Sequence, residues 1–181
     1  VQMITMNFGS FKDYDMSNRF FNRNLAGGAM LDIGVYALSI VRSFMAQKPD
    51  KLLSQMWPAP TGVDEQTSIL LQNDLGQMAT VALTMHSKQP KRAMISGEKG
   101  YIEIMEYPRA DKAFFTDAIT GKKEEICYGE TAQALFYEMR DMEQAVLTGN
   151  VDVMKLQYSV DVMEIMTRLR KSWGLTYPEE E

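Results

Sequence analysis

Alternation of apolar and polar residues dominates the middle of this chain and sets most of its fold. Val81, Leu83 and Met85 alternate with Thr80, Ala82 and Thr84, so one face of this segment is apolar and the other carries small, weakly polar residues. Similar short segments, bounded by Gly, Pro, Asn and Asp, recur along the chain. They predict about eight strands, at residues 1–11, 51–57, 66–72, 77–86, 91–96, 101–105, 113–116 and 124–128.

Short turns join these segments, which favours antiparallel pairing over crossover connections. Residues 73–76 separate two of the strands and residues 97–100 separate another two. Helical spacing occurs over 29–45, 132–147 and 153–173. Strands followed by helices, without repeated strand-helix alternation, predict an α+β fold. We expect an open, largely antiparallel sheet with helices packed on one face.

Each of the two C-terminal helical segments carries an apolar stripe. The first stripe consists of Leu135, Met139, Met142 and Val146, and the second of Val153, Leu156, Val160 and Met163. Because residues at this spacing share one face of a helix, we expect both stripes to pack into the core.

Length and charge argue against several classes of function. A chain of 181 residues, 45 % of them hydrophobic, can bury one good core, so we expect a single domain over 1–181. Its net charge of −5, with acids and bases interspersed, argues against nucleic acid as a partner. The apolar run over 37–46 is interrupted by Arg42 and is shorter than the roughly 20 residues that span a bilayer, which argues against a membrane. The single Cys127 forms no internal disulfide, which fits the cytoplasm.

A glycine pair, Gly27 and Gly28, opens the first helical segment, which carries Asp32 and Tyr36. Residues four apart on a helix lie one above the other, so the carboxylate and the phenol can reach one cleft. A phenol can donate or accept the proton when an alcohol and a carbonyl interconvert. The alternative is structural: an acid near a helix N-terminus, an amphipathic tyrosine at the edge of the core, and glycines that allow tight packing.

Residues 19–38 resemble the start of the C-terminal domain of the Gfo/Idh/MocA oxidoreductases. In that family a glycine cluster precedes an aliphatic residue, then the string D-I-G-V, then a His or Tyr. Here the glycine cluster is Ala26-Gly27-Gly28, the aliphatic residue and the string are Leu31-Asp32-Ile33-Gly34-Val35, and the last position is Tyr36. A Tyr at the last position is similar to the branch with dihydrodiol dehydrogenases and glucose–fructose oxidoreductase. Residues 95–104 and 172–178 resemble a strand-turn-strand and the terminus of the same domain, so the resemblance covers the chain.

The resemblance implies the substrate-binding and oligomerisation domain of an oxidoreductase that transfers hydride between NAD or NADP and a sugar, polyol or diol. It implies Tyr36 and Asp32 as catalytic residues and Arg19 and Asn22 as substrate-binding residues. Gly27 and Gly28 are the only candidates for cofactor contact in this chain. It also implies a homodimer or higher homo-oligomer formed through the sheet.

Two features of the complete family are absent from the sequence. There is no G-x-G-x-x-G fingerprint and no lysine in an E-K-P context, so the nucleotide-binding domain would precede Val1 and we expect the isolated chain to be inactive. The alternative is a non-catalytic dimerisation or small-ligand-binding module of the same fold. His86 is the only histidine, and because suitable further ligands are lacking we expect no metal site and a structural role for this residue.

Overall fold

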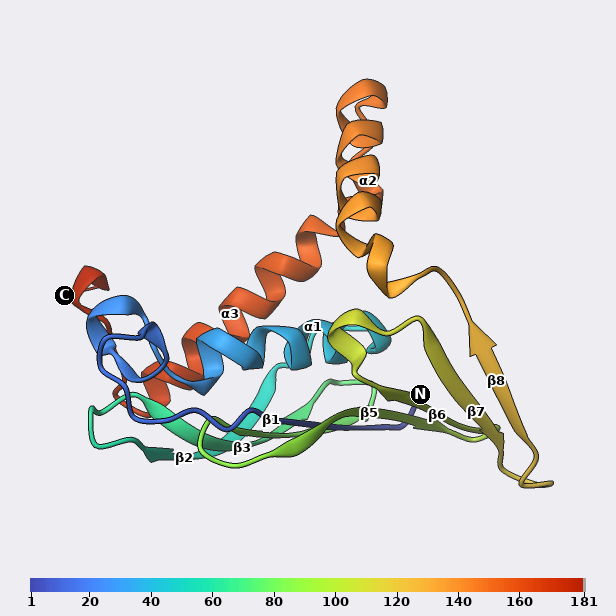
Figure 1. Ribbon diagram of the computed structural model, residues 1–181. Coiled ribbons are helices and arrows are strands. Elements are labelled where there is room, and N and C mark those ends of the chain that lie inside the picture. Colours follow the sequence, from blue (N-terminus) through green and yellow to red (C-terminus); the bar gives the residue numbers. More distant parts are fainter. Residues whose placement is uncertain (181) are drawn as a thin grey trace.

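The computed structural model describes residues 1–180, and within them one sheet of eight strands carries the fold. Figure 1 shows the sheet with the longer helices on one side of it. The predicted α+β fold and the number of strands are confirmed. The strands are β1 (Met3–Gly9), β2 (Lys51–Pro58), β3 (Asp64–Gln72), β4 (Met78–Thr84), β5 (Gln89–Gly97), β6 (Gly100–Met105), β7 (Lys112–Asp117) and β8 (Lys123–Cys127).

β1 lies in the middle of the sheet although it comes first in the chain. The strand order is β2-β3-β4-β1-β5-β6-β7-β8. Neighbouring strands are antiparallel except for β1 and β4, which run parallel with Met6 beside Val81. The short link between β4 and β5, residues 85–88, therefore crosses from one side of β1 to the other. This insertion is the one departure from antiparallel pairing.

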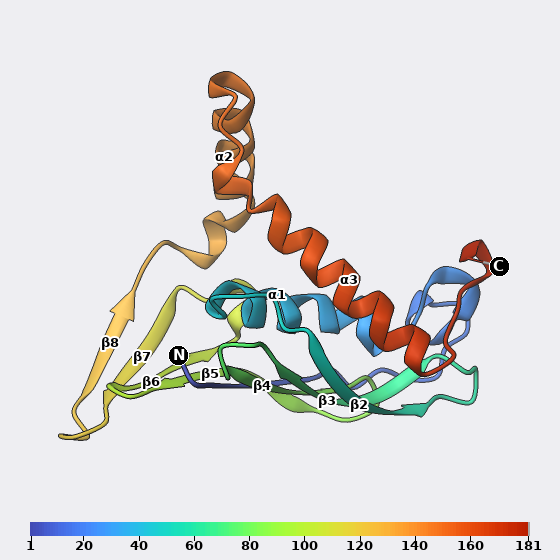
Figure 2. The same cartoon turned by 180° about the vertical axis from the view of Figure 1, so that it is seen from behind.

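The alternation of the central strands decides which face becomes the core. Ile4, Met6, Val81 and Leu83 are each at most 2 % exposed and point towards the helices. Thr80 lies on the opposite face and is only partly buried, as its place in the pattern predicts. Seen from behind in Figure 2, the helices again lie on one side of the sheet and leave that opposite face uncovered.

The helices are α1 (Val35–Phe44), α2 (Ala134–Thr148) and α3 (Leu156–Ser172). α1 continues directly from a π-helical segment, η3 (Met30–Gly34). Single 3-10 turns complete the described chain, at η1 (Arg19–Phe21), η2 (Arg23–Leu25), η4 (Tyr107–Arg109), η5 (Thr131–Gln133), η6 (Asp152–Met154) and η7 (Pro178–Glu180).

A buried ion pair joins α1 to α3. Arg42 Nε lies 2.6 Å from Asp161 Oδ2, and the two residues are 9 % and 4 % exposed. The Arg42 guanidinium also lies 4.2 Å from the ring centre of Tyr158.

By length and hydropathy alone, the helical stretch Arg23–Phe44 could cross a membrane, but half of its most apolar window is buried within the protein. Burial of this kind is typical of a core helix, and it explains the long apolar run.

The predicted core stripes of α2 and α3 are wrong. The four α2 residues, Leu135, Met139, Met142 and Val146, are 50 % to 72 % exposed, and the second stripe, Val153, Leu156, Val160 and Met163, is 47 % to 59 % exposed. α3 instead buries Val162, Ile165, Met166 and Leu169. α3 is apolar on two opposite sides, and its sequence alone does not say which side faces the sheet. α2 stands away from the sheet (Figure 1), and its main contacts are with the adjoining turns η5 and η6.

A matched pair of valines on α3 tests this assignment. Val162 is 2 % exposed, whereas Val160 is 59 % exposed. We expect Val162→Ala to lower the free energy of unfolding by about 2 kcal/mol, because it removes buried methyl groups and leaves a cavity. Val160→Ala should leave it unchanged or raise it slightly, since alanine favours a helix. Urea denaturation of both variants measures the difference, and a larger loss at Val160 would restore the original stripe to the core.

Candidate active site

The helix that carries Asp32 and Tyr36 begins at two buried glycines. Gly28 has a φ of +114°, and a Cβ at this position would collide with the Asp64 carboxylate. A side chain on Gly27 would collide with the backbone of Arg19 and Asn22. The chain therefore needs glycine at both positions in order to close the loop before the helix.

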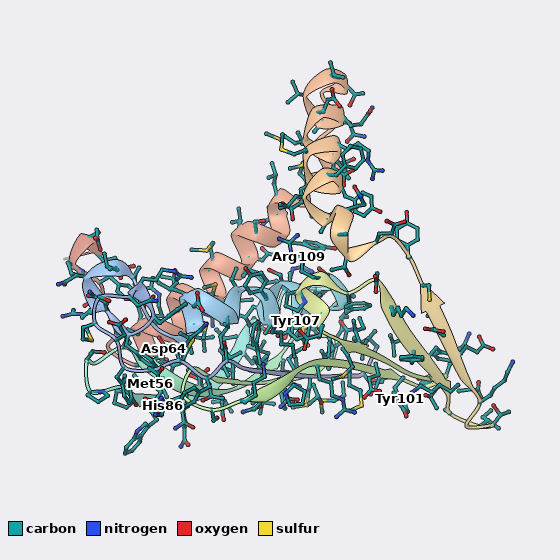
Figure 3. All side chains as sticks on the ribbon, in the orientation of Figure 1. Met56, Asp64, His86, Tyr101, Tyr107 and Arg109 are labelled. Atoms are coloured by element: carbon teal, nitrogen blue, oxygen red, sulfur yellow. The ribbon has the colours of Figure 1, made fainter. Side chains whose placement is uncertain are left out.

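Asp64, at the start of β3, holds the beginning of this helix. Its Oδ2 accepts a hydrogen bond of 2.6 Å from the Met30 backbone N–H, and the residue is fully buried. Burial raises the pKa of the Asp64 carboxyl to about 7, although the Met30 bond and the Arg170 charge oppose that shift. Its Oδ1 has no hydrogen-bond partner within residues 1–180. Figure 3 shows Asp64 and His86 at one end of the sheet and Tyr101 towards the other.

The C-terminal segment closes over the same glycines. The Tyr177 hydroxyl donates a hydrogen bond of 2.6 Å to the Gly27 carbonyl oxygen, and the Arg23 Nε donates one of 2.9 Å to the Thr176 carbonyl. Arg170 donates two hydrogen bonds of 2.8 Å to the Glu180 carboxylate, which fixes this end of the chain. The pKa of Glu180 falls to about 2, chiefly because its carboxylate accepts the Arg170 hydrogen bonds.

Asp32 lies in η3 and pairs with Arg19. The Arg19 guanidinium donates a hydrogen bond to Asp32 Oδ1, and the two side chains are 52 % and 11 % exposed. Arg19 and Lys12 both lie over the ring of Phe20, at 5.2 Å and 4.3 Å from its centre. Two cationic groups therefore flank one ring beside the Asp32 carboxylate.

Tyr36 lies one turn after Asp32 and is 48 % exposed. Its ring centre is 6.2 Å from that of Phe8, which itself packs edge-on against Tyr107 at 6.1 Å. The Lys91 ammonium lies 5.4 Å from the Phe8 ring centre and 3.0 Å from the Glu106 carboxylate. Within residues 1–180 the Tyr36 hydroxyl has no hydrogen-bond partner, and its exposure leaves it open to a ligand.

The structure brings Arg19 and Asp32 together, and Tyr36 follows on the next turn without a hydrogen bond to either within residues 1–180. The π-helical segment that carries Asp32 and leads into α1 is an uncommon backbone form that recurs at functional sites. An open phenol one helical turn after a carboxylate that pairs with an exposed guanidinium can bind an oxygen-rich ligand and exchange a proton with it.

The remaining predicted site residues have structural contacts. Asn22 Nδ2 donates to the Met16 carbonyl at 3.1 Å, and Asn22 Oδ1 accepts from the Asn24 N–H at 3.0 Å. The N–H groups of Gly27 and Gly28 donate to the Asn22 and Phe20 carbonyls. These bonds account for the residues by local structure, and their predicted ligand-binding roles stay predictions.

His86 lies in an aromatic stack, as expected for a structural histidine. Its ring stacks with those of Phe11 and Tyr14, at 5.1 Å and 4.4 Å between ring centres, and its Nδ1 is 3.0 Å from the Lys12 carbonyl oxygen. The Tyr14 hydroxyl hydrogen-bonds to the Glu65 carboxylate, which raises the pKa of Tyr14. Residues 1–180 contain no cluster of three or more His, Cys, Asp or Glu side chains that could hold a metal ion.

Sequence reasoning missed Asp64, Tyr177 and Lys12. Asp64 lies 34 positions from Met30 and Tyr177 lies 150 from Gly27, so no local spacing indicates either contact. The one available signal in the sequence is an acidic pair, Asp64 with Glu65, directly before the predicted strand 66–72. The structure places both residues in β3 and buries them. Charged residues are rarely buried without a specific partner.

The buried Asp64 carboxyl should give the stability of this chain a distinctive pH dependence. Its pKa is about 7 in the folded chain against an ordinary value of 3.8. The folded state therefore binds the Asp64 proton more tightly than the unfolded state does. The contribution of this proton to the free energy of unfolding is complete below about pH 4 and is lost as the pH rises through 7. Asp64→Asn keeps an oxygen to accept the Met30 bond but removes the titration.

We expect the free energy of unfolding of Asp64→Asn, relative to wild type, to rise by about 3 kcal/mol between pH 4 and 7. Urea denaturation across this range measures it. Glu180→Gln is the control, because the lowered pKa of Glu180 places its effect between pH 4.5 and 2. Parallel pH profiles for wild type and Asp64→Asn would show that Asp64 does not titrate in this window.

Comparison with known proteins agrees with this geometry. Residues 1–103 match the model of the GFO/IDH/MocA C-terminal domain. The chain is 28 % identical over 180 residues to the trans-1,2-dihydrobenzene-1,2-diol dehydrogenase of Mus musculus, covering 93 % of this chain and 53 % of that protein. It is 29 % identical over 171 residues to the enzyme of that name from Xenopus tropicalis, covering 88 % of this chain and 51 % of the relative. The chain thus spans about half the length of these curated relatives.

Solved structures share the fold. A variant of a 3-ketoreductase from Actinomadura kijaniata, in complex with TDP-benzene and NADP, superposes with a TM-score of 0.78 at 16 % identity, over 94 % of this chain and 53 % of that one. The aldose-aldose oxidoreductase of Caulobacter crescentus, complexed with glycerol, gives a TM-score of 0.71 at 19 % identity, with the same coverages. The family model matches more than half of the sequence, and the chain therefore belongs to the GFO/IDH/MocA family, whose C-terminal domain it contains.

Proposed function

We propose that this chain is the substrate-binding part of an NAD(P)-dependent oxidoreductase that acts on a sugar, polyol or diol. The observation that carries the proposal is the exposed Tyr36 phenol, held one turn after the Arg19–Asp32 pair on a helix whose start is fixed by Gly28 and Asp64. The names of the relatives support the substrate class, since they include diol dehydrogenases and an aldose oxidoreductase.

The cofactor contacts of such an enzyme would come mainly from another part of the protein. The backbone N–H groups of Gly27 and Gly28 are already bonded within the loop, so they offer no donors to a pyrophosphate. The exposed side of Tyr36 does fit a neighbouring nicotinamide, because the phenol is open and no side chain of residues 1–180 bonds to it. A bound nicotinamide supplies or accepts the hydride.

The residues of this chain transfer the proton and orient the substrate. Tyr36 gives its phenolic proton to the substrate oxygen during reduction and takes a proton from the hydroxyl during oxidation. Arg19 is half exposed, so it can donate hydrogen bonds to a second oxygen of a diol or sugar. Asp32 fixes the guanidinium in place through their hydrogen bond.

Removing the Tyr36 hydroxyl tests the proposal in the complete protein. Tyr36→Phe keeps the ring on Phe8 but removes the proton donor, so kcat should fall by about 10² to 10⁴ while the melting temperature hardly changes. Asp32→Asn should cause a smaller loss, because the amide can still accept a bond from Arg19. Tyr128→Phe is the control, since Tyr128 is 90 % exposed and directly follows β8, the outermost strand of the sheet.

Steady-state rates with NADH and NADPH on diol, polyol and sugar substrates give the readout. Activity of Tyr36→Phe within about threefold of wild type would refute the catalytic assignment. It would favour the alternative of a non-catalytic ligand-binding or dimerisation module.

We also propose that two copies associate through the helix-free face of the sheet. A shallow hollow on this face is lined by Thr5, Asn7, Leu53, Leu70, Thr80 and Ala82, among others. A face of small and apolar side chains suits a symmetric contact between two copies, which needs about 1,000 Å² or more to be specific.

Sedimentation of this chain from micromolar to hundred-micromolar concentration tests the dimer. We expect association that Thr80→Arg weakens at least tenfold, because the new charge would be buried at the contact. Lys123→Arg, on the outer strand β8, is the control and should leave it unchanged. A monomer at all concentrations would contradict this use of the face.

A further inference from the structure

One lysine beside the candidate site has a cationic head group that no acid of the described chain neutralises. The Lys12 ammonium lies 4.3 Å from the centre of the Phe20 ring, and no carboxylate of residues 1–180 forms an ion pair with it. The Arg19 guanidinium, on the same ring, is already paired with Asp32. An ammonium carries three donors and no acceptor. Lys12 therefore offers its charge and its N–H groups to a ligand.

The backbone of Lys12 is fixed on both sides of its side chain. Its N–H donates to the Met85 carbonyl at 2.8 Å, and its carbonyl oxygen lies 3.0 Å from His86 Nδ1. The His86 ring stacks in turn with the rings of Phe11 and Tyr14. This aromatic stack sets the point from which the Lys12 side chain leaves the backbone. A ligand that binds a lysine fixed in this way orders less of the protein than one that binds a mobile surface lysine.

A second lysine reaches the surroundings of Tyr36 through Phe8. The Phe8 ring centre lies 6.2 Å from that of Tyr36 and 5.4 Å from the Lys91 ammonium. Lys91 pairs with Glu106, but the Glu106 side chain is 64 % exposed, so solvent weakens this pair. Glu106 has a φ of +51°, and its N–H donates to the Lys91 carbonyl at 2.7 Å. Backbone strain at a residue other than glycine is concentrated at binding and active sites.

The candidate site is therefore positive in a chain that is negative overall. Lys12, Arg19 and Lys91 bring three positive charges to it. Asp32 and Glu106, the carboxylates paired with two of these cations, bring two negative charges. The whole chain has a net charge of −5. A neutral diol or sugar leaves the local excess of positive charge unmatched, whereas an anionic substrate is attracted by it.

We propose that the substrate is a sugar or polyol that carries a carboxylate, and that Lys12 binds this carboxylate while Tyr36 faces the reacting oxygen. The inference rests on the function proposed above and narrows its substrate class. A hydrogen bond from an ammonium to a carboxylate is about twice as strong as one between neutral groups. A phosphate fits less well, because the Gly27 and Gly28 N–H groups at the start of the helix are already bonded within the loop.

A comparison of acids with their neutral amides tests the proposal in the complete protein. D-glucuronate and D-gluconate are each compared with the corresponding amide, which keeps the shape and loses the charge. We expect kcat/KM to be higher for the acids by about tenfold or more, and Lys12→Gln to remove this preference. Lys91→Gln should reduce it less, because Lys91 already has an acidic partner.

Lys123→Gln is the matched control. The Lys123 ammonium also lies over a ring, 4.2 Å from the centre of Phe114, and has no carboxylate partner within residues 1–180. It belongs to β8, the outermost strand, so its loss should leave the preference for acids unchanged. Isothermal titration of the same proteins with D-glucuronate and D-glucuronamide provides a readout besides activity.

Acids that are bound and turned over no better than their amides would overturn the proposal. So would equal effects of Lys12→Gln and Lys123→Gln, or a Lys12→Gln variant that loses affinity for NADPH but keeps the preference for acids. Turnover of neutral diols without that preference would retain the proposed function and reject the carboxylate site. Tighter binding of D-glucuronate that Lys12→Gln abolishes, in a protein without oxidoreductase activity, would retain the carboxylate site and reject the proposed function.

Discussion

The contact between the Asp64 carboxylate and the start of the first helix is the interaction on which the candidate site depends. Asp64 belongs to the sheet, and its hydrogen bond to the Met30 N–H fixes where the helix begins. The carboxylate lies so close to Gly28 that no side chain fits there, and Tyr177 closes the other side by bonding to Gly27. A negative charge at a helix N-terminus is favourable, but its burial is costly, and glycine packing makes the close approach possible. This junction fixes the start of the helix that carries Tyr36, and the Arg42–Asp161 pair holds its far end.

Local patterns predicted much of the fold, and long-range contacts account for what they missed. Alternation such as Thr80-Val81-Ala82-Leu83 predicted the strands and their buried faces, because side chains alternate across a strand by geometry. It did not predict that β1 lies between β4 and β5, since that pairing joins residues some 75 positions apart. α3 was assigned the wrong buried face because both faces are apolar. Periodicity identifies faces, but only the partner decides which one is covered.

The sequence indicated which residues could form the candidate site, but it indicated less about how they are arranged. The spacing of Asp32 and Tyr36 indicated one cleft, and the structure does place them on successive turns. It adds that Arg19 bonds to Asp32, that Asp32 lies in a π-helical segment directly before α1, and that the glycines serve packing.

The most direct test of the central claim compares two glycines that both have a positive φ. Gly28 and Gly62 have φ values of +114° and +85°, but a Cβ on Gly62 meets nothing within 4 Å, whereas one on Gly28 meets Asp64. If the junction fixes the helix, Gly62→Ala should cost about 1 kcal/mol of unfolding free energy from backbone strain alone, and Gly28→Ala about 3 kcal/mol or more. Urea denaturation of both variants measures this difference. Equal losses would mean that the contact with Asp64 does not hold the helix in place.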